Sequence, residues 1–250
     1  MRTRNDARGY DALRPVNIDV GVQANPEGSV LYSSGKTKVL VAASLEEGVK
    51  DWLRGKGRGW VTAEYAMHPR ANPSRQRREG WGREVSGRTQ EIQRLVGRAL
   101  RSSVDLKALG ERSVSIDCDV LDADGGTRTA AITGGWIALA MALDRLRKKG
   151  LVSRGVLREP IAAISVGYFE GHAMLDLNYD EDSKADVDLN IVATASGAIV
   201  EVQGTAEGAP LPKSAFDAML DLGLGAIPKL IDGQKAALEA AGIPWRELVA

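Results

Sequence analysis

The stretch from Asp117 to Trp136 constrains the fold most, because two different periodicities meet in it at a pair of glycines. Just before and within its start, Val114, Ile116, Cys118 and Val120 alternate with polar residues, which predicts a half-buried strand. Residues 130–146 are small and apolar at helical spacing, which predicts a helix. The chain therefore contains a strand that turns directly into a helix.

The turn between these elements, Gly125-Gly126-Thr127-Arg128, has the composition of an anion site. The glycines allow backbone angles that other residues avoid, and Thr127 can cap the helix. The first free N–H groups of the helix then point out of the turn, and Arg128 adds a forked, permanent charge suited to phosphate. A tight turn followed by a capped surface helix explains the same residues, and such turns are common.

Length and composition exclude several classes of protein. A chain of 250 residues forms one large domain or two compact ones, and its composition is that of a globular protein. We expect no membrane association, because no apolar run reaches ~18 residues, and no secretory signal, because residues 1–6 lack an apolar region. The single cysteine, Cys118, predicts a buried thiol in a reducing compartment, hence a cytoplasmic protein. Two histidines give poor support for zinc sites or Ser-His-Asp triads.

The formal charge is balanced, with 33 basic and 33 acidic residues, but it is unevenly distributed. Between Arg70 and Arg101, nine arginines against three glutamates give a net +6. Between Asp176 and Asp188, six acids against one lysine give a net −5. The first block suits a polyanion, and the second suits a divalent cation.

Further periodicity predicts strands, helices and one irregular segment along the chain. The segment from Arg2 to Arg14, with four arginines, reads as a loose basic arm. Strands are expected at residues 16–22, 30–33, 38–43, 60–67, 161–166, 187–193 and 199–205, with another beginning at 171. Helices are expected at residues 90–109, 216–222 and 227–241.

Two acids in the second half are candidate metal ligands. Asp188 projects from one face at the start of a strand, and Asp182 lies in the preceding loop. Carboxylates so placed can share one Mg²⁺, which takes one or two protein carboxylates together with waters and phosphate oxygens. A solvated acidic loop is the simpler interpretation of these residues alone.

The run Asp-Cys-Asp-Val-Leu-x-Ala-Asp-Gly-Gly-Thr-Arg-Thr-Ala, residues 117–130, resembles the signature of the ribonuclease PH family, phosphate-dependent 3′ exoribonucleases that trim tRNA. Residues 59–65, 87–95 and 201–208 are similar to further blocks of that family, in the same order. The resemblance extends from about Arg8 to Gln234. The family's usual Met-Leu-Pro-Arg-Ala-Thr reads Met-His-Pro-Arg-Ala-Asn at residues 67–72, a difference that bears on RNA preference.

The resemblance implies an α+β fold of two related βα halves, a two-layer arrangement with mixed sheets and helices packed on them. The expected halves are residues 1–150, for RNA and phosphate, and residues 151–250, for the catalytic acids. It also implies a homo-oligomer, a hexameric ring built as a trimer of dimers.

The resemblance assigns roles to individual residues. It implies that Arg88, Gly126, Thr127 and Arg128 hold the attacking phosphate. Asp182 and Asp188 would be the catalytic and metal-binding carboxylates, for Mg²⁺ or Mn²⁺. Arg70, Arg75 and Arg78 would contact the RNA backbone or a neighbouring subunit.

The implied activity is phosphorolysis: inorganic phosphate attacks the last 3′ phosphodiester of an RNA, chiefly a tRNA precursor, and releases a nucleoside 5′-diphosphate. Two alternatives stay open, a hydrolytic Mg²⁺ nuclease that uses the same acids and a non-catalytic RNA-binding ring subunit. Hydrolytic sites generally need more carboxylates for two metals. Because aromatic residues make up 5% of the chain, we expect limited base stacking and recognition by backbone and shape.

Overall fold

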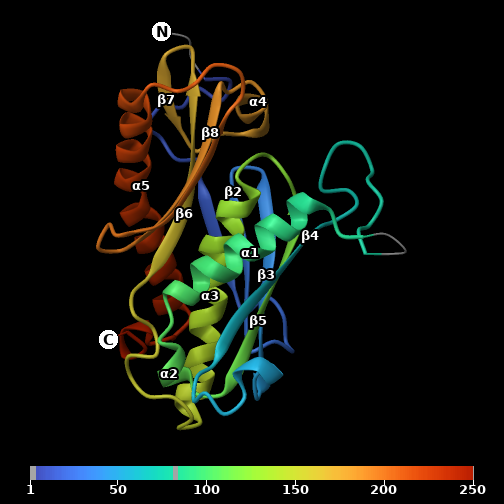
Figure 1. Ribbon diagram of the computed structural model, residues 1–250, viewed down its shortest axis with the longest axis vertical. Helices are drawn as coiled ribbons and strands as arrows, with labels where there is room; N and C mark the ends of the chain where they lie inside the picture. The colour runs from blue at the N-terminus through green and yellow to red at the C-terminus, as the bar shows by residue number, and fades with distance from the viewer. Residues whose placement is uncertain (1–3, 81–83, 250) are drawn as a thin grey trace.

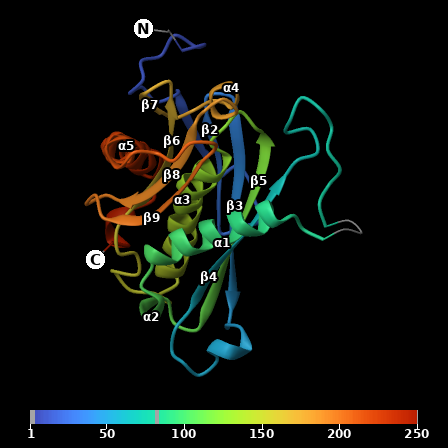
Figure 2. The same cartoon turned by 45° about the horizontal axis from the view of Figure 1, so that its top comes forward.

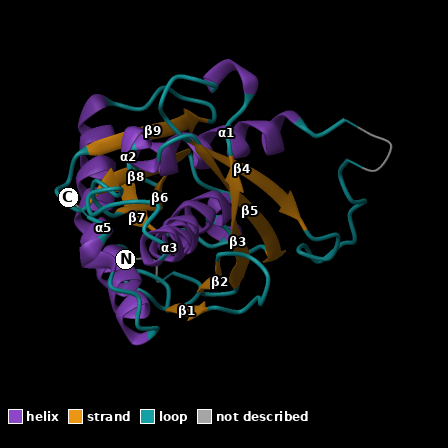
Figure 3. Ribbon diagram, turned by 90° about the horizontal axis from the view of Figure 1, so that it is seen from below, coloured by secondary structure: helices purple, strands orange, loops and turns teal. Residues whose placement is uncertain are grey.

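The computed structural model describes residues 4–80 and 84–249, which form two β-sheets with helices between and around them (Figure 1). Helix α3 lies in the centre, with the strands of one sheet on one side and those of the other sheet on the opposite side (Figure 3). The α+β fold with two sheet-containing halves is thereby confirmed. No helix in residues 4–80 and 84–249 is long and apolar enough to span a bilayer.

The first sheet has five strands in the order β1-β2-β3-β5-β4. It is mixed, because β4 pairs parallel with β5 while the other pairs are antiparallel. The predicted strands and the hairpin between β2 and β3 are confirmed. The strands are β1 Val16–Val20, β2 Gly28–Ser34, β3 Thr37–Glu47, β4 Trp60–Met67 and β5 Arg112–Asp122.

The second sheet has four antiparallel strands in the order β7-β6-β8-β9. Strands β6 and β8 lie at its centre, and the predicted strands in this half are confirmed. The strands are β6 Ile161–Phe169, β7 His172–Leu175, β8 Val187–Thr194 and β9 Ile199–Ala206. Asp188 is the second residue of β8, as expected.

The helices are α1 Gly87–Ser102, α2 Leu106–Leu109, α3 Thr127–Lys148, α4 Tyr179–Asp182 and α5 Lys213–Ala240, with short 3₁₀ turns at Asp51–Leu53 and Trp245–Glu247. Helix α3 is buried on nearly all sides, and its Trp136 is 0% exposed. A helix so enclosed needs small residues for close packing, which explains its alanines and glycines. Helix α5 packs on the outer face of the second sheet (Figure 1).

The prediction of one helix over residues 90–109 is wrong. Helix α1 ends at Ser102, and the separate α2 begins after Asp105. The side chain of Asp105 accepts hydrogen bonds from the backbone N–H groups of Lys107 and Ala108, at 2.9 and 3.1 Å. This cap satisfies free N–H groups at the start of α2 and therefore separates α2 from α1.

The prediction of two C-terminal helices is also wrong, because α5 runs unbroken through Gly223 and Gly225. Glycine near the middle of a helix usually weakens it. At Gly223 an added Cβ would collide with the Ile191 side chain on β8, so the glycine permits close packing of α5 on the sheet. Tertiary contact here overrides local propensity.

The expected loose basic arm is wrong from Arg4 onward; Arg2 lies outside the described residues. The Arg4 side chain is 0% exposed and pairs with Glu181 at 2.7 Å. Arg14 is 4% exposed and pairs with Asp176 at 2.6 Å. Both arginines therefore attach the N-terminal segment to the second half of the chain. By contrast, the segment after β4 extends away from both sheets only beyond Ala71 (Figure 2), which is 6% exposed and accepts a hydrogen bond from the Ala123 N–H at 2.9 Å.

Candidate active site

The turn from β5 into α3 has the conformation that its two glycines allow. Gly125 and Gly126 have φ values of 75° and 65°, in the region that favours glycine. Gly126 is the N-cap of α3, so the expectation that Thr127 caps the helix is wrong. The Thr127 hydroxyl lies 2.8 Å from the Tyr65 hydroxyl of β4 instead. Helix α3 begins at the turn, so its first N–H groups and the positive end of its dipole lie there.

Side chains from distant segments hold this turn in place. Arg14 donates to the carbonyl oxygen of Asp124 at 2.6 Å and to Asp176 Oδ1 at 2.6 Å. The Thr37 hydroxyl donates to the carbonyl oxygen of Gly125 at 2.7 Å and accepts from the Asp124 N–H at 2.9 Å. The turn is therefore fixed to the start of β3 and, through Arg14, to the second half of the chain.

The segment Leu177–Tyr179 lies directly against the glycine turn. A Cβ atom at Gly125 would stand 2.6 Å from the carbonyl oxygen of Leu177 and 3.1 Å from the nitrogen of Tyr179. The Tyr179 N–H also donates to Asp124 Oδ1 at 3.2 Å. Only glycine permits this approach, which brings the acidic segment against the glycine turn.

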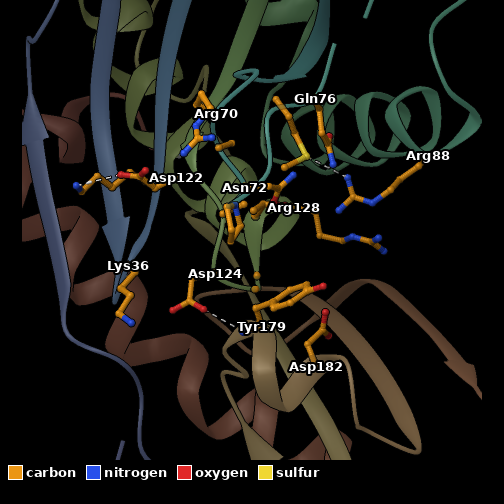
Figure 4. A pocket seen from close by; sticks show the side chains of 18 of the residues that line it. Lys36, Arg70, Asn72, Gln76, Arg88, Asp122, Asp124, Arg128, Tyr179 and Asp182 are labelled. Atoms are coloured by element: carbon orange, nitrogen blue, oxygen red, sulfur yellow. Dashed lines mark hydrogen bonds and ion pairs between the residues drawn. The ribbon is translucent and has the colours of Figure 1, made fainter. Parts of the chain in front are cut away.

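These segments enclose a cavity of about 1380 Å³ between the two halves (Figure 4). It contains most of the predicted site residues: Arg70, Arg88, Gly126, Thr127, Arg128, Asp182 and Asp188. Arg75 and Arg78 do not line it; they line a neighbouring cavity of about 860 Å³ in the arginine-rich segment. The structure thus brings the predicted anion turn and the two acids into one site.

Electrostatics in the cavity oppose ionisation of both acids. Loss of surrounding water raises the pKa of Asp182 above its ordinary value, although Arg128 and Arg88 act in the opposite direction. Burial also raises the pKa of Asp188, and the nearby charge of Asp182 raises it further.

The prediction that Asp182 lies in a loop is wrong in detail, because it is the last residue of α4.

The two acids fit a divalent cation that keeps most of its water. Asp188 Oδ2 accepts a hydrogen bond from Asn190 Nδ2 at 3.1 Å, while the buried Oδ1 has no hydrogen-bond partner among the described residues. A buried carboxylate oxygen without a partner is costly unless a ligand satisfies it. Within residues 4–80 and 84–249 there is no cluster of three or more histidine, cysteine, aspartate or glutamate side chains suited to a metal. Two carboxylates suit Mg²⁺ completed by waters and phosphate oxygens better than an all-protein metal site.

The two arginines nearest the turn differ in how they are held. Arg128 Nη1 donates to Gln203 Oε1 at 3.3 Å, and its Nη2 lies 3.9 Å from Glu91 Oε2. Arg88, in the first turn of α1, is exposed, with its Nη1 3.8 Å from the Met67 sulfur. One guanidinium is thus oriented by two polar neighbours, and the other extends from α1 into the cavity (Figure 4).

Sequence reasoning missed several residues of the cavity: Lys36, Asp124, Ser165, Tyr179 and Asn190. Asn190 was detectable, because it lies two residues after Asp188 and so faces the same side of β8. Ser165 was not, since it enters the site by pairing opposite Asn190 across β6 and β8. The buried Ser165 hydroxyl has no hydrogen-bond partner among the described residues.

Family models match both halves of the chain. The model described as 3′ exoribonuclease family, domain 1, matches residues 12–143, and the model for domain 2 of the same family matches residues 159–226. The second match contains both acids, and the first contains the glycine turn.

Whole proteins of known name are similar over almost the full chain. A ribonuclease PH from Crocosphaera subtropica is 55% identical over 238 residues, which cover 95% of this chain and 98% of that relative. A ribonuclease PH from Maricaulis maris is 52% identical over 236 residues, covering 94% of this chain and 99% of that relative.

Solved structures agree with the fold. Rice Rrp46 superimposes with a TM-score of 0.77 at 19% identity, covering 94% of this chain and all (100%) of that one. A chain of the Archaeoglobus fulgidus exosome with RNA bound to the active site has a TM-score of 0.76 at 25% identity, covering 92% of each chain.

Proposed function

The chain belongs to the ribonuclease PH family of 3′ exoribonucleases, and from that membership we propose that the cavity between the glycine turn and the two acids is its phosphorolytic active site. The protein is a phosphate-dependent 3′-5′ exoribonuclease. Its reaction exchanges one phosphodiester for another phosphate linkage of similar energy, so it also runs backwards as nucleotide addition. We propose tRNA precursors with 3′ extensions as its substrates.

Inorganic phosphate binds at the glycine turn in this proposal. The N–H groups of Gly126, Thr127 and Arg128 and the guanidinium groups of Arg88 and Arg128 supply donors and positive charge. A phosphate oxygen attacks the phosphorus of the last phosphodiester, and the 3′ oxygen of the penultimate nucleotide leaves. The new P–O bond makes a nucleoside 5′-diphosphate, and the leaving oxygen takes up a proton to become the new 3′ hydroxyl.

Asp182 and Asp188 act at the leaving-group side of this bond. A bound Mg²⁺ or Mn²⁺ would offset charge on the phosphoryl oxygens. The raised pKa of each acid also suits a group that holds a proton and donates it to the leaving oxygen. The pair therefore suits two roles: to bind a cation when ionised, or to keep a proton and donate it.

The single observation that carries the proposal is the contact between Gly125 and the segment Leu177–Tyr179. Residues that bind an anion and residues that bind a cation lie in different halves of the chain. This close approach places both within one cavity, as a reaction between phosphate and a phosphodiester requires.

For the RNA strand, we propose that Arg70 contacts its backbone inside the cavity. Arg75 and Arg78, in the exposed segment that extends from the sheets, would contact RNA further from the reacting bond or a neighbouring subunit. We propose a hexameric ring in the cytoplasm. The matched exosome structures support assembly, and the buried free thiol of Cys118 supports a reducing compartment.

The proposal is tested with a 3′-extended tRNA, Mg²⁺ and the purified protein, with and without phosphate. We expect nucleoside diphosphates only when phosphate is present, and loss of release when a chelator removes the cation. Monophosphates without phosphate would mean hydrolysis. RNA binding with no release under any condition would mean a non-catalytic ring subunit.

Arg128→Ala is expected to raise the KM for phosphate by about 10- to 100-fold, because a charge-assisted hydrogen bond to the anion contributes about 1.5–3 kcal/mol. Arg128→Lys should recover part of the loss, since it keeps the charge without the forked donors. Initial rates measured across a phosphate series check this expectation.

Arg98→Ala is the matched control for Arg128. Arg98 is 62% exposed on α1, forms an ion pair with Glu201, and does not line the cavity. Its loss should leave the KM for phosphate within about twofold, as for an exposed ion pair. Equal effects of the two variants would contradict the assignment of Arg128.

A further inference from the structure

Tyr179 presents an aromatic ring to solvent inside the cavity. It is 60% exposed, more than any other large apolar or aromatic side chain among the described residues. Of the described residues that line the cavity, it is also the only aromatic one. A single exposed ring is ordinary on a protein surface. Its location in the wall of the site is what requires explanation.

The backbone beneath the ring is held rigidly. The Tyr179 N–H is bonded to Asp124, the residue before the glycine turn. Asn178 caps the α4 turn by accepting from the Glu181 N–H at 3.1 Å, and the Glu181 side chain accepts in return from the Asn178 N–H at 3.1 Å. Buried Arg4 then donates to Glu181 at 2.7 and 2.8 Å. A side chain with two rotatable bonds on a fixed backbone loses little entropy when it binds a ligand.

The ring lies beside the reacting groups. Tyr179 and Asp182 are three residues apart in α4, so their side chains share one side of the turn. In Figure 4 the ring lies between Asp124 and Asp182, with its hydroxyl directed toward the side of the cavity that contains Arg128 and Asp182. An RNA whose 3′-terminal phosphodiester sits between the glycine turn and the acids therefore has a neighbouring base next to this ring.

We infer that Tyr179 is the stacking platform for a nucleobase adjacent to the scissile phosphodiester. The inference rests on the proposed function, because it takes the position of the RNA from the proposed phosphate and metal sites. Stacking on an aromatic ring accepts every base, since each base has a π face. An exonuclease that removes successive nucleotides needs such tolerance. A paired base is already stacked within a helix, so the platform selects single-stranded 3′ ends.

This assignment refines the expectation of limited stacking. Recognition by backbone and shape still applies to most of the RNA, because the arginines outnumber the aromatic groups around the cavity. One ring at the reacting end is sufficient to hold the terminal nucleotides in line for successive attacks.

The test measures binding of a short single-stranded RNA to the full-length protein at constant phosphate, by fluorescence anisotropy, together with KM and kcat. Tyr179→Ala is expected to raise the Kd and KM for RNA by roughly 5- to 100-fold, the range for loss of one stacked base. The KM for phosphate should change by less than about twofold, since the anion turn is untouched. Tyr179→Phe should behave like the wild type, and Tyr179→Leu should not.

An RNA with abasic riboses at its last two positions isolates stacking. The wild type and Tyr179→Ala should bind this RNA with equal affinity, because there is no base to stack. Trp52→Ala is the matched control: Trp52 is 49% exposed but lies at the opposite end of the molecule, in the light-blue 3₁₀ turn of Figure 1, so binding should be unchanged.

Two results would overturn the inference. One is an equal loss of affinity for normal and abasic RNA, which would mean that the ring contacts the backbone. The other is a smaller oligomer by light scattering in Tyr179→Ala, which would mean that it contacts a neighbouring subunit. If the wild type instead binds RNA but releases no diphosphate, the proposed reaction fails, while the comparison of Kd values still decides the role of Tyr179.

Discussion

Asp182→Asn should lower kcat for phosphorolysis by about 10³-fold or more while RNA binding is retained, because asparagine neither holds the cation as a carboxylate nor carries a transferable proton. The comparison uses single-turnover release of nucleoside diphosphate and the Kd for the same RNA. An unchanged turnover would remove Asp182 from the site. Asp186→Asn is the matched control, since Asp186 is an exposed acid of the same segment that does not line the cavity.

Asp182→Asn should not lower the stability of the metal-free protein. Both acids have a folded-state pKa above the ordinary value of 3.8. The folded state therefore binds more protons than the unfolded state in the window above that value, and the free energy of unfolding falls as the pH rises through it. Removing the charge of Asp182 should leave the Tm equal or higher without metal. A lower Tm would mean that the carboxylate has a stabilising partner.

Arg14→Ala should lower the free energy of unfolding by about 3–5 kcal/mol, the usual cost of removing one partner of a buried ion pair. The variant leaves the 4% exposed side chain of Asp176 charged and uncompensated. It also removes the donor to the Asp124 carbonyl at the glycine turn, so activity should fall with stability. Urea unfolding followed by circular dichroism measures the first effect.

Two comparisons show whether this cost comes from burial. Lys38→Ala removes an ion pair with Asp122 in which both side chains are about half exposed, 48% and 51%, so it should cost less than about 1 kcal/mol. Asp176 has a φ of 53°, which asparagine tolerates, so Asp176→Asn changes the charge without straining the backbone. If Arg14→Ala lowered the free energy of unfolding as little as Lys38→Ala, the ion pair between Arg14 and Asp176 would not contribute to holding the two halves together.

The local periodicity of the sequence was sufficient for the strands and for the glycine turn. The alternation around Cys118 and the helical spacing after Ala130 are strong signals, because burial on one face imposes each pattern. The boundaries that failed depend on contacts that periodicity does not record. The cap at Asp105 divides one predicted helix, and the packing of Gly223 against Ile191 joins two others.

The site was predictable where a residue type has one plausible use. Gly126, Arg128 and Asp188 lie in the cavity as expected from the family resemblance. Arg14, Ser165 and Tyr179 were missed, because their roles arise from tertiary pairing: an ion pair across the two halves, a register between two strands, and a turn pressed against a glycine. None of these three contacts produces a recognisable residue spacing in the sequence.

The clamp formed by Arg4 and Arg14 has a consequence for the order of folding during synthesis. These arginines are separated from their partners Glu181 and Asp176 by 177 and 162 residues. At about 5–20 residues per second, a ribosome needs roughly 8–30 s to make the 162 residues between Arg14 and Asp176. During that time Arg4 and Arg14 cannot pair with Glu181 and Asp176. The glycine turn likewise has no contact with Asp182 and Asp188 until the second half has left the ribosome. In the proposed mechanism, the nascent chain gains nuclease activity only after residues up to Asp188 have been made, so a shorter nascent chain does not degrade the RNAs around the ribosome that makes it.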